Sequence, residues 1–124
     1  MNNNLKEMTF FNYGEIEPYL NNKGTNLYFE EGDTIVNRGS SPNYIFFIKK
    51  GKVLGQRDYS DGNEFNYFQI DEKNGSIGLL EVLSRKEKYV ATITCLSDVE
   101  IIRVPSDIVY RTIMNNSELL QMVV

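Results

Sequence analysis

The sequence predicts a mainly β protein of the sandwich, barrel or roll type, flanked by short helices at both ends. Short runs rich in β-branched and aromatic residues recur from residue 26 onward, and turns with glycine, Asn or Asp separate them. Longer helical patterns occur before and after this stretch. The 124 residues fit one domain with a modest core, and 41% hydrophobic and 24% charged residues are ordinary for a globular protein.

A short helix is predicted at residues 13–22, where acidic residues and Pro18 lie near the start and Lys23-Gly24 ends the segment. The β-rich part begins after it. We expect strands at residues 26–29, 34–37, 44–50, 52–59, 64–70, 89–95 and 99–104. The turns at 31–33, 38–43, 50–52 and 60–63 each supply a glycine or an Asx residue, so chain reversals are too frequent for a parallel βαβ design.

Beyond residue 104 the pattern becomes helical again. Pro105 and Ser106 predict a strand stop and an N-cap, and apolar residues at helical spacing then predict a helix to about Met114. Ser117 is expected to cap a second helix that is still apolar at Val124. These apolar residues must either pack back on the domain or meet a partner helix.

Charge and composition exclude several functions. Thirteen basic residues stand against seventeen acidic ones, so the net charge of −4 provides no broad cationic face for DNA. Histidine is absent, which removes the usual general base and the commonest metal ligand. We therefore predict no catalytic residues, no metal site and no enzyme activity, and the absence of imidazole also disfavours a metal-binding cupin.

The single cysteine, Cys95, lies in an alternating apolar run, and we interpret it as a buried structural thiol in a reducing compartment. The first residues lack a signal-peptide pattern, and no apolar run reaches membrane-spanning length. A cytoplasmic protein without a membrane partner is expected.

Three segments carry a family resemblance when they are taken in order. The first has an acidic-Gly-acidic turn between two strands, the second has an aromatic-Ile-x-x-Gly-x-Val hairpin, and the third has a glycine before a short apolar helix and two further strands. They occupy residues 29–39, 45–53 and 75–83 with 89–93 and 98–105. Over residues 20–124 the chain resembles the cyclic-nucleotide-binding domains of Crp/Fnr regulators and of related kinase and channel sensors.

This resemblance implies a double-stranded β-helix, or jelly roll (β-roll). Residues 1–24 would form an N-terminal helical segment, 25–105 the roll, and 106–124 the C-terminal helices with the start of a truncated dimerisation helix. In the family that helix leads to a helix-turn-helix DNA reader. The expected role is therefore effector sensing for a transcription regulator, with a homodimer formed through the C-terminal helix and DNA bound only by a domain outside this chain.

The family's phosphate-binding cassette combines backbone amides, an arginine on the phosphate and a glutamate on the ribose. Gly78 with residues 79–83 matches the first part, but Leu79 stands at the glutamate position and Tyr89 at the arginine position. A buried phosphate without its cation would cost about 2 to 5 kcal/mol. The sequence therefore predicts a degenerate cassette and a ligand other than cyclic AMP.

Two substitutions for the missing groups are open. Glu81 could replace the glutamate, and Arg85, Lys86 or Lys88 could reach inward. We interpret Glu81 as an exposed helix carboxylate, because two positions along a helix turn a side chain to nearly the opposite side, and the basic residues as solvated.

The candidate ligand-binding residues are Gly78, Leu79, Leu80, Glu81, Lys88, Tyr89, Val90 and Ala91. Tyr89 and Leu79 could line an apolar pocket with one hydroxyl for a small aromatic or apolar effector, or these side chains could simply fill the core. Two alternatives stay open beside a changed effector. One is true cyclic AMP or cyclic GMP binding with an inward Lys88, and the other is a ligand-free scaffold that dimerises through residues 117–124. No cofactor beyond such an effector is indicated.

Overall fold

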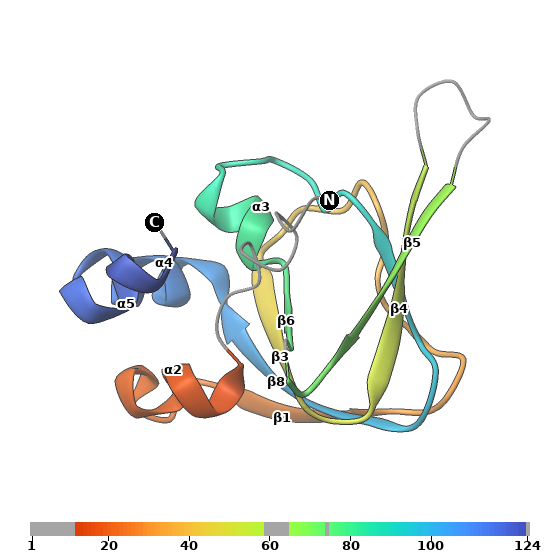
Figure 1. The fold of residues 1–124 in the computed structure, drawn as a ribbon, viewed down its shortest axis with the longest axis horizontal. Helices are drawn as coiled ribbons and strands as arrows, with labels where there is room; N and C mark the ends of the chain where they lie inside the picture. Colours follow the sequence, from red (N-terminus) through yellow and green to blue (C-terminus); the bar gives the residue numbers. More distant parts are fainter. Residues whose placement is uncertain (1–11, 59–64, 74, 124) are drawn as a thin grey trace.

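The computed structural model describes residues 12–58, 65–73 and 75–123 (Figure 1). The helices are α2 (Tyr13–Leu20), α3 (Leu79–Leu83), α4 (Ser106–Met114) and α5 (Ser117–Val123). The strands are β1 (Thr25–Phe29), β2 (Thr34–Val36), β3 (Tyr44–Lys50), β4 (Lys52–Asp58), β5 (Phe65–Asp71), β6 (Ser76–Ile77), β7 (Thr92–Cys95) and β8 (Val99–Pro105).

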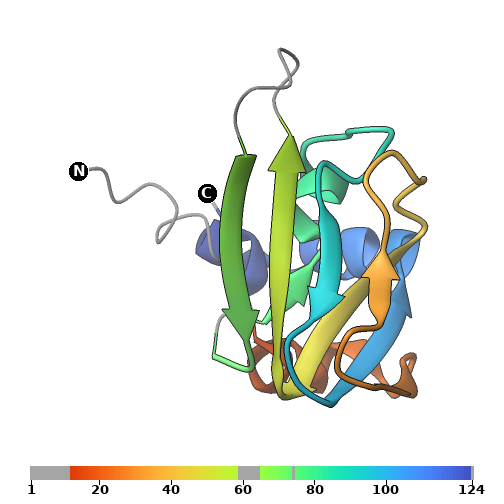
Figure 2. The ribbon, with the colours of Figure 1, turned by 90° about the vertical axis from the view of Figure 1, so that its right-hand side faces the viewer.

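In the part of the chain that the structure describes, eight antiparallel strands form two four-stranded sheets. One has the order β1-β8-β3-β6 and the other β2-β7-β4-β5. Figure 2 shows the second sheet face-on, with the helices behind it. This arrangement confirms the predicted mainly β jelly roll with short flanking helices.

Two strand predictions need correction. The strand expected at 89–95 begins only at Thr92, and the two-residue strand β6 was not anticipated because it is too short to show alternation. The predicted turn at 60–63, including Gly62, lies outside the described residues.

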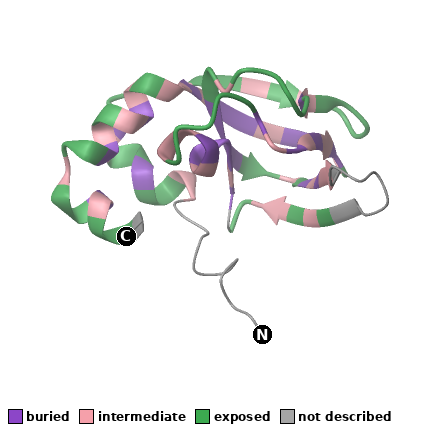
Figure 3. Ribbon diagram, turned by 90° about the horizontal axis from the view of Figure 1, so that it is seen from above, coloured by how far each residue is buried: buried purple, intermediate pink, exposed green. Residues whose placement is uncertain are grey.

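The roll has two apolar cores because its first sheet is covered on both faces. In β3, Phe46 and Ile48 pack between the sheets, while Ile45 and Phe47 pack against the helices. This double burial explains the unbroken apolar run in the middle of that strand. In Figure 3 the buried residues lie along these two layers, and the connecting loops are largely exposed.

The C-terminal helices pack back on the domain. α4 begins at Ser106 with Pro105 as its N-cap, so the prediction that Ser106 caps the helix was wrong; the Ser106 hydroxyl instead donates to the Pro42 carbonyl at 2.6 Å. α5 is capped by Asn116, whose side-chain oxygen accepts from the Leu119 amide at 3.0 Å, not by Ser117. Leu119 is 1% exposed, and it joins the core between the helices and the sheet.

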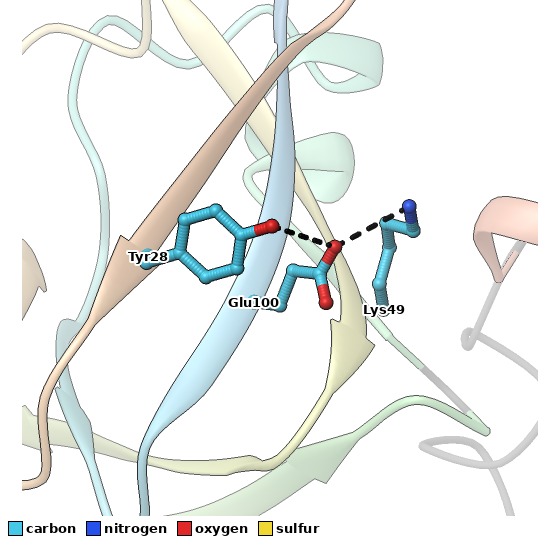
Figure 4. Close-up of polar contacts among 3 residues, drawn as sticks. All are labelled: Tyr28, Lys49 and Glu100. Atoms are coloured by element: carbon cyan, nitrogen blue, oxygen red, sulfur yellow. Dashed lines mark hydrogen bonds and ion pairs between the residues drawn. The ribbon is translucent and has the colours of Figure 1, made fainter.

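The outer face of β1, β8 and β3 carries a polar cluster (Figure 4). Tyr28 and Glu100 are register partners on adjacent strands, and the tyrosine hydroxyl lies 3.4 Å from a carboxylate oxygen of Glu100. The ammonium group of Lys49 lies 3.5 Å from the same oxygen. Because these groups are partly exposed, they contribute little to stability and keep only this exposed part of the face polar, since Ile102 and Val104 of β8 on the same face are buried under the helices.

No helix among the described residues combines the length and apolar character needed to span a membrane.

Candidate functional site

The candidate site lies where β6 leads into α3. Gly78 is the N-cap of α3, is buried, and has a φ of +96°, which lies in the left-handed region that favours glycine. A Cβ at this position would lie 3.1 Å from Cε1 of Tyr89 and 3.2 Å from the carbonyl oxygen of Tyr44. The cassette glycine is therefore needed both for its backbone angle and for the close approach of Tyr89.

Tyr89 is 5% exposed, and its hydroxyl donates to the Tyr44 carbonyl. Its backbone is also fixed, because its N–H donates to the Ser40 carbonyl at 2.8 Å and its carbonyl accepts from the Gly39 amide at 2.9 Å. These bonds extend the β2–β7 pairing toward the cassette. The side chain and backbone of Tyr89 are thus fully engaged within the chain.

The environment of Tyr89 favours a neutral side chain. Burial raises the pKa of its hydroxyl from 10.0 to about 12, and the nearby carboxylate of Glu81 adds to the increase. At neutral pH this position offers a phenol rather than a charge. A phenol cannot neutralise a cyclic phosphate as the family's arginine does.

Leu79 and Tyr89 point into different cores. Leu79 is 1% exposed and belongs to the cluster between the helices and the first sheet, while Tyr89 and Ala91 belong to the cluster between the sheets. Leu80 is half-buried. The structure therefore does not bring Leu79 and Tyr89 together in one pocket.

Glu81 is not the exposed carboxylate that the sequence suggested. It is 8% exposed, and its Oε2 accepts a hydrogen bond from the backbone N–H of Val90 at 3.1 Å. This expectation was wrong because a five-residue helix followed by a returning loop covers both of its sides. Glu81 thereby ties α3 to the segment that carries Tyr89.

The basic residues after α3 are exposed, as expected. Lys86 and Lys88 lie on the surface, and the guanidinium of Arg85 lies 5.7 Å from the ring centroid of Tyr110 on α4. Arg85 also has a left-handed φ of +58°. None of these three side chains is buried beside Gly78 and Tyr89.

Sequence reasoning missed the contribution of Tyr44. It enters the site through its backbone carbonyl, which any residue type would supply, so the sequence contains no signal for it. The roles of Gly39 and Ser40 are likewise backbone roles.

Cys95 is buried, as predicted, and burial raises the pKa of its thiol from 9.0 to about 11, with further contributions from Asp33 and Asp98. Such a thiol is unreactive near neutral pH. Within residues 12–58, 65–73 and 75–123, no three Cys, Asp or Glu side chains are grouped as metal ligands would be.

The fold is a β-roll in which a buried glycine, Gly78, precedes the short helix α3. The family model of the cyclic nucleotide-binding domain matches residues 26–116, and the chain belongs to this family. Comparison with curated proteins gave no match.

Solved structures share the fold at low sequence identity. The N-terminal domain of a transcriptional regulator from Streptomyces coelicolor A3(2) has a TM-score of 0.65 and 21% identity, over 88% of this chain and 76% of that one. A cAMP-binding acyltransferase from Mycobacterium smegmatis has a TM-score of 0.68 and 21% identity, over 89% and 33%. The regulatory subunit of a cAMP-independent protein kinase A from Trypanosoma cruzi, bound to guanosine, has a TM-score of 0.61 and 21% identity. The match covers 68% of this chain and 29% of that one.

Proposed function

We propose that this chain is the effector-sensing domain of a Crp/Fnr-like transcription regulator, and that its effector is not cyclic AMP. The observation that carries the proposal is the state of Tyr89, which stands at the family's arginine position. It is buried against Gly78, and its hydroxyl is bonded to the Tyr44 carbonyl. A cyclic phosphate in this cassette would lose its cation, at a cost of about 2 to 5 kcal/mol.

The two substitutions considered from the sequence receive no support. Glu81 already accepts from Val90 and lies too deep to exchange that partner for a ribose hydroxyl without leaving a buried amide unbonded. Lys88 is exposed, and Arg85 lies against Tyr110. The residues present therefore do not fit a cyclic nucleotide bound in the family's manner.

A neutral ligand with an aromatic or apolar body is the better match to a cassette without a buried cation. The Trypanosoma cruzi protein supports this idea, because guanosine has no phosphate and that subunit is described as cAMP-independent. We extend the same reasoning to this chain and propose a small aromatic or apolar effector, with a nucleoside as the first compound to test.

Ligand binding would report through the helices. α3 and α4 pack against each other, and α4 packs against α5. We propose that an effector shifts the balance between two arrangements of these helices, and that a DNA-binding domain of a longer protein or partner responds. Dimerisation through residues 117–124 is part of the same proposal.

The test is thermal unfolding with millimolar cyclic AMP, cyclic GMP, adenosine and guanosine. A ligand at a hundred times its dissociation constant stabilises by about 2.7 kcal/mol, so binding would be visible as a shift in Tm. We expect no shift with either cyclic nucleotide and a shift with at least one nucleoside. A clear shift with cyclic AMP would overturn the proposal, and no shift with any compound would favour the ligand-free scaffold.

A variant with a cation at position 89 tests the same proposal by gain of function. The variant Tyr89→Arg should acquire cyclic AMP binding, because it supplies a phosphate cation beside Gly78. The control is Tyr28→Arg, which adds the same charge on the exposed outer sheet face. Equal cyclic AMP binding by both variants would show that the cassette positions are not responsible.

A further inference from the structure

A concave surface lies outside the roll, between the end of α3 and the start of α4. It is a shallow cleft of about 330 Å³, and its walls include Val82, Arg85, Lys86, Ser106, Asp107 and Tyr110. This volume is at the lower end of the range for small-molecule sites. The cleft shares none of these residues with the contact between Gly78 and Tyr89.

Two cations line the cleft without an acidic partner. Among the described residues, neither Arg85 nor Lys86 forms an ion pair. Nη2 of Arg85 lies 3.3 Å from the hydroxyl of Tyr110, which leaves most of its five N–H donors available. An exposed arginine and lysine on one wall make a site for an anion.

Hydrogen bonds fix the backbone of Arg85 and Lys86, at an energetic cost. The Lys86 amide donates to the Glu81 carbonyl and the Arg85 amide to the Val82 carbonyl, which is the Schellman pattern at the end of α3. Arg85 occupies the left-handed position of this motif, where glycine is usual, at a cost of about 1 to 2 kcal/mol. The last carbonyls of α3 thereby accept hydrogen bonds within the chain, so they repel a bound anion less.

The wall formed by α4 has one feature that attracts an anion, the start of the helix, and one that repels it, the carboxylate of Asp107. The first turn of the nine-residue helix α4 lies there, and its macrodipole favours a negative group. Asp107 also lines the cleft, but its carboxylate lies 3.5 Å from the guanidinium of Arg111. Val82 and the ring of Tyr110 supply apolar surface beside the cations.

We propose that the α3–α4 cleft binds a small organic anion, with its phosphate or carboxylate on Arg85 and Lys86 and its aromatic or apolar body against Val82 and Tyr110. Such a ligand would bridge the cassette helix and α4 and would stabilise their present packing. This proposal does not depend on what occupies the roll.

The experiment is an NMR titration of the whole chain at low ionic strength with phenyl phosphate, benzoate, inorganic phosphate and phenol. We expect phenyl phosphate or benzoate to shift the amides of residues 82–86 and 106–110, and the tighter of the two identifies the headgroup. Inorganic phosphate should bind more weakly and phenol hardly at all. Failure of both aromatic anions to bind there would overturn the proposal.

Charge variants test whether the cleft itself is responsible. Arg85→Gln and Lys86→Gln should each weaken binding by on the order of tenfold, because each removes a charge-assisted hydrogen bond. Asp107→Asn should strengthen it. Lys88→Gln is the matched control, since this exposed lysine of the same loop does not line the cleft. If Lys88→Gln weakened anion binding as much as the other two variants, net charge alone would explain the effect, and the proposal would be overturned.

Discussion

The hydroxyl of Tyr89 donates a hydrogen bond to the backbone carbonyl of Tyr44, and so joins the segment before β7 to the first residue of β3. Tyr89 also packs on Gly78, so one side chain connects both sheets with the start of α3. Tyr89 therefore serves the packing and the hydrogen bonding of this chain.

The raised pKa values of Tyr89 and Cys95 predict alkaline destabilisation. Both groups hold their protons more tightly in the folded state, with pKa values of about 12 and about 11 against 10.0 and 9.0. The unfolded chain therefore binds fewer protons above pH 9, so the free energy of unfolding falls as pH rises, through about pH 12. Urea denaturation at a series of pH values measures this slope.

Two variants separate the contributions to that slope. Cys95→Ala should remove the part that begins near pH 9, and Tyr89→Phe should remove the part between about pH 10 and 12. A slope that is unchanged in both variants would contradict the assignment.

Replacing Glu81 by alanine should destabilise the domain by about 1 to 3 kcal/mol, because the partly buried Val90 amide loses its acceptor. Denaturant unfolding measures the change. Glu87→Ala is the control, since Glu87 is exposed in the loop that follows α3. Equal losses in the two variants would argue against the Glu81–Val90 hydrogen bond.

Gly78 and Gly39 allow a matched comparison of how much an added side chain destabilises the fold. Their φ angles are +96° and +95°, but a Cβ at Gly39 would meet no atom within 4 Å, whereas one at Gly78 would press on Tyr89 and Tyr44. Gly39→Ala should therefore cost only the left-handed strain of about 1 to 2 kcal/mol, and Gly78→Ala should cost more. Unfolding free energies that are equal for both variants would contradict the close packing at Gly78.

The C-terminal helix should contribute to the stability of the single chain. Leu119→Ala should cost about 2 to 5 kcal/mol, because Leu119 is fully buried in the helix-side core. Met122→Ala should change little, since Met122 is 48% exposed. The measurement is thermal unfolding at several protein concentrations. A Leu119 effect that appeared only where a dimer forms would place this residue in an interface instead.

Local patterns were sufficient for most of the elements. The run from Tyr44 to Lys50 was predicted with the bounds that the structure has, because alternation and turn residues act over a few neighbouring positions. Helical spacing likewise predicted α4 to about Met114, although the N-cap is Pro105 and not Ser106. The start of β7 and the cap of α5 were not. Residues 89–91 have a strand-like composition, but Tyr89 pairs with the backbone groups of Gly39 and Ser40, and the Val90 amide donates to the Glu81 side chain, which no local pattern specifies.

The sequence alone determined the jelly roll and the order along the chain of Gly78, Leu79 and Tyr89, since these depend on residue types in order. Only the tertiary structure decided how those residues are used. Leu79 and Tyr89 point into separate cores, Glu81 is turned inward to Val90, and Arg85 is held beside Tyr110. The physical reason is that burial and hydrogen-bond partners come from segments that are distant in the chain, and many of these partners are backbone groups common to all residues.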